Sequence, residues 1–154
     1  MVSTPQGALD HKILRPIIAA GSTKLLTHND DGSVVKLDTL AGSTVTLPKA
    51  LGSGVSFHFI VSVLATSNSH VVKVGNTTDV MQGIILMNGD TAANACEAFA
   101  AAATDDTITL NRSTTGSVSL GEHVEVIDVD PGVWQVRGSV SATGAEATPF
   151  SATV

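Results

Sequence analysis

Short runs of alternating apolar and polar residues fill this chain, and turn-forming residues separate one run from the next. The clearest run covers residues 55–64, where Phe57 and Phe59 fall on one face and Ser56 and His58 fall on the other. A period of two is typical of a β-strand with one buried face, whereas a helix repeats about every 3.6 residues. Val, Thr, Ala and Ser make up nearly half of the chain, and β-branched residues favour a pleated surface. The pattern predicts an all-β protein.

Turn signals recur roughly every ten residues, which is typical of a β-sandwich or a closed barrel. Amphipathic helices do not separate the runs, which argues against a parallel α/β fold. Two stacked sheets would also hide the long edges that one flat sheet exposes. We therefore expect a jelly-roll-like β-sandwich of about ten short strands. The expected strands cover residues 23–27, 34–39, 44–47, 55–64, 71–74, 80–87, 107–111, 122–129, 133–140 and 143–154, and residues 91–104 fit a helix or a strand equally well.

The first 21 residues differ from the rest of the chain, so we expect an N-terminal arm over 1–21 and a β-sandwich domain over 22–154. Pro5 and Pro16 interrupt any long regular element in the arm. An apolar arm with nothing of its own to fold against packs on a neighbouring molecule; alternatively, these residues form the first edge strand of the body. Both interpretations stay open at this point. The large aliphatic residues of the arm are Leu9, Ile13, Leu14, Ile17 and Ile18.

Charge and hydropathy restrict the partners. The 154 residues include 14 acidic and 8 basic ones, which gives a formal net charge of −6. A nucleic-acid-binding face needs clustered cations, and the chain has no such cluster, so we expect no nucleic acid. No apolar run approaches the roughly 18 residues of a membrane span, so we expect no membrane contact. Hydrophobic residues make up 43% of the chain and charged ones only 14%, and oligomerisation is the simplest way to bury such a surface.

No motif of an enzyme stands out in the sequence. It contains no Gly-x-Ser-x-Gly elbow, no Walker phosphate loop and no Gly-x-Gly-x-x-Gly dinucleotide fingerprint. The five histidines are scattered along the chain. His58 and His70 could meet across neighbouring strands, but two imidazoles without a third ligand make a poor zinc site. We therefore expect no metal, no cofactor and no enzymatic activity.

Three other features have structural explanations. Cys96 is the single cysteine, which excludes an intrachain disulfide, and no local base activates it, so we expect a buried, small apolar side chain. Residues 29–32 partly match a calcium-binding loop but lack the remaining ligands, which favours a solvated turn. Trp134 alternates in phase with Val136, which indicates a core anchor rather than a sugar-binding platform.

Several strand-and-turn segments of this chain resemble head decoration (cement) proteins of tailed bacteriophages. The resemblance extends over about residues 22–154 and is weakest in the arm. Gly-Ser-Thr-Val-Thr-Leu-Pro runs such as residues 42–48 also occur in phage fibre and knob proteins. The segments that carry the resemblance are residues 42–48, 69–75, 79–83, 106–111, 132–134 and 144–150.

The resemblance implies a structural virion protein, made in the host cytoplasm and bound as a homotrimer to the outer surface of the head. Its partners would be the major capsid protein and other copies of itself, and its role would be to stabilise contacts between capsomers. The arm residues Leu9, Ile13, Leu14, Ile17 and Ile18 are the candidates for contact with the capsid or a neighbouring subunit. The alternative is a head-fibre or tail-fibre knob that binds a host surface.

Overall fold

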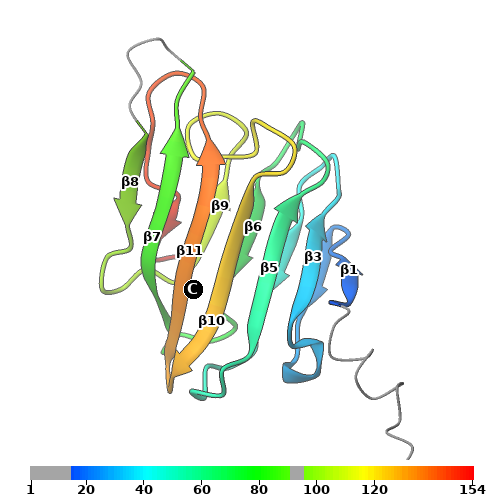
Figure 1. The fold of residues 1–154 in the computed structure, drawn as a ribbon, viewed down its shortest axis with the longest axis vertical. Coiled ribbons are helices and arrows are strands. Elements are labelled where there is room, and N and C mark those ends of the chain that lie inside the picture. Colours follow the sequence, from blue (N-terminus) through cyan, green and yellow to red (C-terminus); the bar gives the residue numbers. More distant parts are fainter. Residues whose placement is uncertain (1–14, 91–95) are drawn as a thin grey trace, which may run out of the picture.

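The computed structural model describes residues 15–90 and 96–154, which form twelve strands and one short 3-10 helix, η1 (His28–Asp30). Seven strands form sheet A in the order β1–β3–β5–β10–β11–β7–β8, and five form sheet B in the order β12–β9–β6–β4–β2 (Figure 1). Sheet A contains β1 (Ile17–Ala19), β3 (Ser33–Leu37), β5 (Ser56–Val61), β7 (Val80–Asn88), β8 (Glu97–Ala100), β10 (His123–Asp130) and β11 (Val133–Ser141). Sheet B contains β2 (Thr23–Leu25), β4 (Thr44–Thr46), β6 (His70–Lys73), β9 (Thr107–Leu110) and β12 (Phe150–Ser151).

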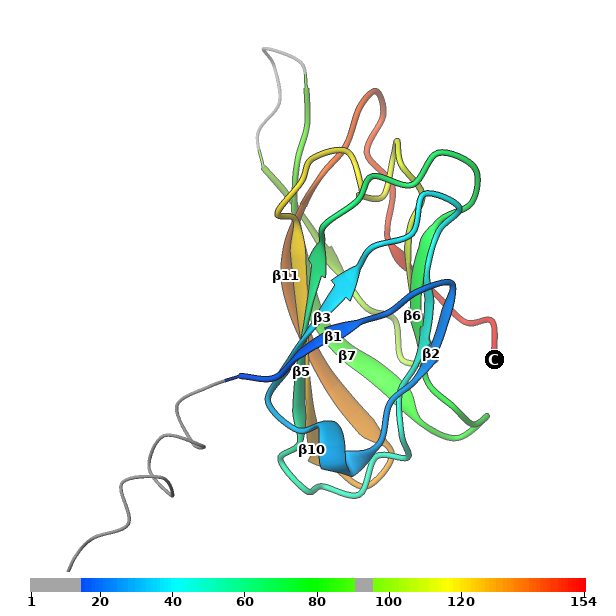
Figure 2. The same ribbon diagram turned by 90° about the vertical axis from the view of Figure 1, so that its right-hand side faces the viewer.

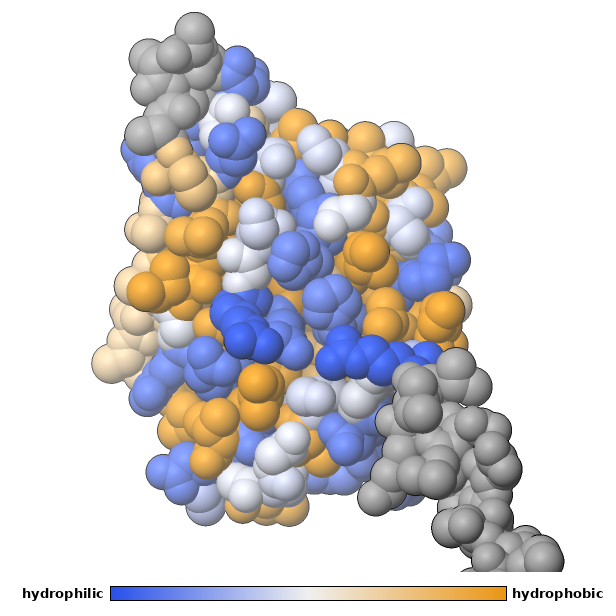
Figure 3. Space-filling model, viewed as in Figure 1, coloured by the Kyte–Doolittle hydropathy of each residue, from blue (hydrophilic) through white to orange (hydrophobic). Residues whose placement is uncertain are grey.

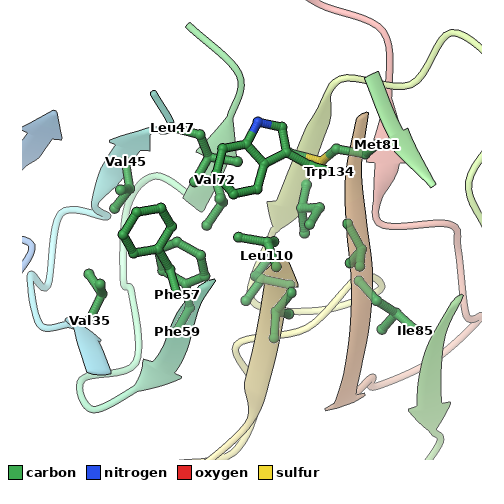
Figure 4. Packing of buried hydrophobic residues seen from close by; sticks show 14 of the residues in the cluster. Val35, Val45, Leu47, Phe57, Phe59, Val72, Met81, Ile85, Leu110 and Trp134 are labelled. Atoms are coloured by element: carbon green, nitrogen blue, oxygen red, sulfur yellow. The ribbon is translucent and has the colours of Figure 1, made fainter. Parts of the chain in front are cut away.

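The two sheets pack face to face (Figure 2). Buried side chains from both inward faces form the hydrophobic core between them. Alternate residues of each strand turn inward: Phe57 and Phe59 of β5 are buried, whereas Ser56 and His58 are partly exposed. Trp134 of β11 is fully buried in the core, and its ring lies 5.9 Å from that of Phe57 (Figure 4). The predicted all-β sandwich and the predicted core position of the tryptophan are confirmed.

The first six strands alternate between the two sheets, so that β1, β3 and β5 lie in sheet A and β2, β4 and β6 lie in sheet B. Successive strands of each sheet therefore run in the same direction, and neighbouring strands in this half of the sandwich pair in parallel. The later strands pair antiparallel, except that β11 pairs in parallel with β7. The parallel pairs distinguish this sandwich from a jelly roll, whose strands pair antiparallel.

Two ambiguous stretches of the sequence prove to be edge strands of sheet A. Glu97–Ala100 forms β8, so the described part of the 91–104 stretch is a strand and not a helix. Ile17–Ala19 forms β1, which pairs in parallel with β3, and the next residue, Ala20, is buried in the core. The end of the predicted arm is therefore part of the sandwich, which begins before residue 22.

Truncation of Trp134 tests how much its burial in the core contributes to the free energy of unfolding. Trp134→Ala is expected to lower the free energy of unfolding by about 3–5 kcal/mol, because it leaves a cavity between the sheets. The indole Nε1 has no hydrogen-bond partner among the described residues, so Trp134→Phe should cost less. Urea unfolding followed by circular dichroism measures both changes. The control is Gln135→Ala at the next, outward-facing position, with an expected effect under about 0.5 kcal/mol. If Trp134→Ala lowers the free energy of unfolding as little as the control does, the burial of Trp134 does not contribute to stability as expected.

Candidate functional site

A shallow hollow of about 400 Å³ lies on the outer face of sheet A, where β5, β10, β11 and β7 run side by side. Figure 3 looks onto this face, on which hydrophobic and hydrophilic residues are interspersed. The lining side chains come mainly from outward-facing positions of these strands, and the inward-facing positions of the same strands fill the core. The lining residues are His58, Leu86, His123, Glu125, Arg137, Gly138 and Ser139.

Two histidines from neighbouring strands stack at this hollow. In the ladder between β5 and β10, His58 pairs with Glu125 and His123 pairs with Ile60, so the two imidazoles are diagonal neighbours. Their ring centroids lie 5.4 Å apart with an interplanar angle of 19°. Burial lowers the pKa of His58 below its ordinary value, and the positive charges of His123, Arg15 and Arg137 lower it further, against the opposing effect of Glu125.

An ion pair lies next to the histidines. Glu125 of β10 and Arg137 of β11 are cross-strand partners, and the Arg137 Nε donates to the Glu125 carboxylate. The side chain of Arg137 is 66% exposed and that of Glu125 only 14% exposed. The arginine therefore presents most of its guanidinium to solvent while the glutamate holds its Nε edge, which leaves positive charge at the rim of the hollow.

The structure corrects the predicted meeting of two histidines. His58 lies on β5 of sheet A and His70 lies on β6 of sheet B, so the two cannot meet across neighbouring strands. His70 is fully buried; its Nδ1 accepts a hydrogen bond from the Ser43 backbone N–H at 3.0 Å, and its Nε2 lies 2.8 Å from the Val63 carbonyl oxygen. Both ring nitrogens are thus used to join two loops. Sequence reasoning missed the partner of His58, since that partner lies more than sixty residues away.

The structure corrects the prediction for Cys96 and confirms the predicted turn at residues 29–32. Cys96 is exposed and not buried, because it immediately precedes the edge strand β8. The turn at 29–32 is confirmed: η1 overlaps its first two residues, and the Asp30 carboxylate accepts hydrogen bonds from the backbone N–H and hydroxyl of Thr27. This carboxylate caps a turn and is not part of a cation site.

Several buried carboxylates also cap backbone. Asp128 is fully buried and accepts hydrogen bonds from the backbone N–H groups of residues 51–53 and from the Ser53 hydroxyl. Burial alone would raise the pKa of Asp128, but the hydrogen bonds from Ser53 and from the loop amides outweigh it, and the net shift is downward. Glu122 accepts in the same way from the amides of residues 117–119. These acids anchor loops to sheet A, and their hydrogen bonds account for their burial.

The candidate arm residues fall into two groups. Ile17 is 73% exposed on β1, at the open edge of sheet A. Its neighbour Ile18 is partly buried and packs against the core of its own sandwich. Leu9, Ile13 and Leu14 lie outside the described residues. Of the described pair, Ile17 alone exposes a large apolar side chain.

The comparisons with known proteins assign no family. The chain matches no protein-family model, and neither a curated protein nor a solved structure is significantly similar to it. Within residues 15–90 and 96–154, no three His, Cys, Asp or Glu side chains are grouped so that they could hold a metal ion. The same part of the chain contains no helix that is long and apolar enough to span a membrane.

Removal of the Asp128 carboxylate tests its capping role. Asp128→Ala is expected to lower the free energy of unfolding by about 3 kcal/mol, because several donors lose a charged acceptor. The lowered pKa means that this stabilisation is present above the unfolded value of about 3.9 and is lost as the pH falls through the lower folded value. Denaturant unfolding between pH 7 and pH 3 measures both effects. Asp130→Ala, an exposed acid on the same strand, is the control; an equal loss there would contradict a specific cap.

The lowered pKa of His58 predicts that the folded protein loses stability in acid. The pKa of His58 is lower in the folded state than the ordinary value of about 6.5, so its contribution to stability is present above that value and declines as the pH falls below it. His58→Gln is expected to flatten the fall in unfolding free energy between about pH 7.5 and pH 5.5. Gln82→Ala, on the outer face of the same sheet, should keep the wild-type profile. An unchanged slope in His58→Gln would show that His58 does not titrate as described.

Proposed function

We propose that this protein is a decoration (cement) protein of a bacteriophage head, which binds the outside of the shell as a homotrimer and stabilises contacts between capsomers. The observation that carries the proposal is the distribution of large aliphatic side chains that are about half exposed or more. They lie on both sheets and in the connecting loops, which suits a rigid body that contacts copies and partners on several sides. They are Ile17, Leu25, Leu40, Leu51, Ile84, Leu86, Leu120 and Val129.

The role would be mechanical. A rigid sandwich with a closely packed core transmits load without a moving part. One small contact with the shell is weak, but three copies bound as a unit engage three sites, and effective concentration multiplies the affinity. A protein that binds only the expanded shell stabilises that state by mass action. The net charge of −6 agrees with a position outside the shell, where there is no packaged DNA to neutralise.

The aromatic residues favour the cement role over a sugar-binding knob. Binding of carbohydrate usually requires exposed aromatic rings. All four Phe and the single Trp lie in the described part of the chain. Four of the five are buried, and the remaining one, Phe99, is partly buried against the core. No aromatic platform is therefore exposed on the described surface.

Copy number tests the proposal. The amount of this protein relative to the major shell protein is measured in purified particles of its source by quantitative mass spectrometry. A ratio near one to one is expected, because a cement protein covers the whole shell. A few copies per particle would favour the fibre or knob alternative, and absence from particles would overturn a virion role.

A truncation tests the arm as the contact. A chain lacking residues 1–14 keeps β1 and the buried Ala20 and should fold, yet its occupancy on shells stripped of the protein is expected to fall at least ten-fold. The control lacks only residues 1–7 and retains Leu9, Ile13 and Leu14, so it should bind as the full chain does. If the chain lacking residues 1–14 binds as well as the full chain does, these residues are not part of the interface.

A further inference from the structure

The hollow on sheet A carries hydrogen-bond donors that have no acceptor. Among the described residues, no other residue makes a hydrogen bond to the ring nitrogens of His58 or His123. The guanidinium of Arg137 has five N–H donors, and its one hydrogen bond within the described chain is made by Nε to Glu125. Imidazole and guanidinium groups thus border one space of about 400 Å³, which is the size of a site for a small molecule or a side chain.

The charge on this face is opposite in sign to that of the whole chain. Lys36 of β3 lies beside Ile60 in the ladder, and the positive charges of Arg15 and Arg137 act on His58. Glu125 is the acidic residue that lines the hollow, and it is already paired with Arg137. A protein of net charge −6 therefore holds an excess of positive charge around the stacked imidazoles.

We propose that this hollow binds a carboxylate group, held by the free N–H groups of Arg137 and by the imidazoles of His58 and His123. The guanidinium fork matches a carboxylate in a bidentate geometry, and protonated imidazole adds a charged donor. Leu86, on the β7 side, packs against the aliphatic part of the ligand. The site stands apart from the cement role, since it requires only the isolated protein.

Protons are taken up when the ligand binds. Without ligand, burial and the neighbouring positive charges oppose protonation of His58. A bound carboxylate offsets these charges, so protonation of His58 becomes favourable and the ligand binds more tightly as the pH falls. The charged groups that face the pair are Glu125 on β10, Arg137 on β11, Lys36 on β3, and Arg15 in the segment before β1; the lining residue from β7 is the uncharged Leu86.

The test is a titration of the full-length protein with two probes, followed by NMR of the imidazole resonances. Glutarate represents a free carboxylic acid, and a blocked tetraglutamate peptide represents the acidic side chains of a partner protein. At least one probe is expected to shift both His58 and His123 at millimolar concentration, with an affinity about ten-fold higher near pH 5.5 than near pH 7.5. Binding of glutarate indicates a free acid as the natural source, and binding of the peptide alone indicates a protein.

Variants separate a site from general attraction between charges. Arg137→Gln should lose at least ten-fold in affinity for the probe, and a variant with both His58→Gln and His123→Gln should lose the pH dependence. The matched control is Lys73→Gln, which removes one positive charge from the outer face of sheet B. The proposal is overturned if neither probe shifts the two histidines near pH 5.5, or if Lys73→Gln weakens binding as much as Arg137→Gln. Circular dichroism confirms that each variant is folded.

Discussion

Burial of two inward sheet faces against each other is the interaction on which the rest of this structure depends. Neither sheet is stable alone, because each would expose a continuous row of Val, Leu, Ile and Phe side chains to water. Trp134 of sheet A and Val72 of sheet B are among the residues that meet in this core. With so few charged residues, the chain has no comparable electrostatic source of stability. The loop caps and the hollow on sheet A are formed by positions that do not take part in this core packing.

The loops follow from the same constraint. A chain that crosses repeatedly between two sheets leaves backbone amides at each corner, and buried amides need acceptors. Asp128 and His70 supply them to amides distant in sequence, and Glu122 supplies them to the loop just before its own strand, so polar side chains at the margins of the core anchor the corners. Acidic and imidazole groups that would suggest chemistry in another setting here complete the hydrogen bonding of turns. His58 and His123, which form no such hydrogen bond with the described residues, lie on the outer face of sheet A.

The sequence predicted much of the fold and little of the site. Alternation placed the strands because most inward residues are apolar, and it assigned Phe57, Phe59 and Trp134 to the core correctly. It also placed His58 on an outward face. It did not identify His123 as the partner of His58, and it proposed His70 instead. Periodicity along one strand carries no information on which other strand lies beside it.

The exposure of Cys96 and the parallel winding of the first half of the sandwich were not predicted for the same reason: both depend on which strands lie next to each other. Cys96 looked like a core residue by type, but it precedes an edge strand, where one side of the backbone has no neighbour. The winding of the first six strands, which makes half of the sandwich parallel, was likewise not predicted, because a strand with one buried face shows the same alternation in either orientation.

The sequence by itself thus determined the class of fold, the residues of the core and the acidic, charge-poor character of the surface, all of which depend on the order of residue types along the chain. The tertiary structure alone decided the pairing of strands, the place of β1 at the edge of sheet A, and the meeting of His58, His123, Glu125 and Arg137. The physical reason is that these depend on hydrogen bonds between segments far apart in sequence, and many pairings satisfy the same local pattern until the whole core is packed.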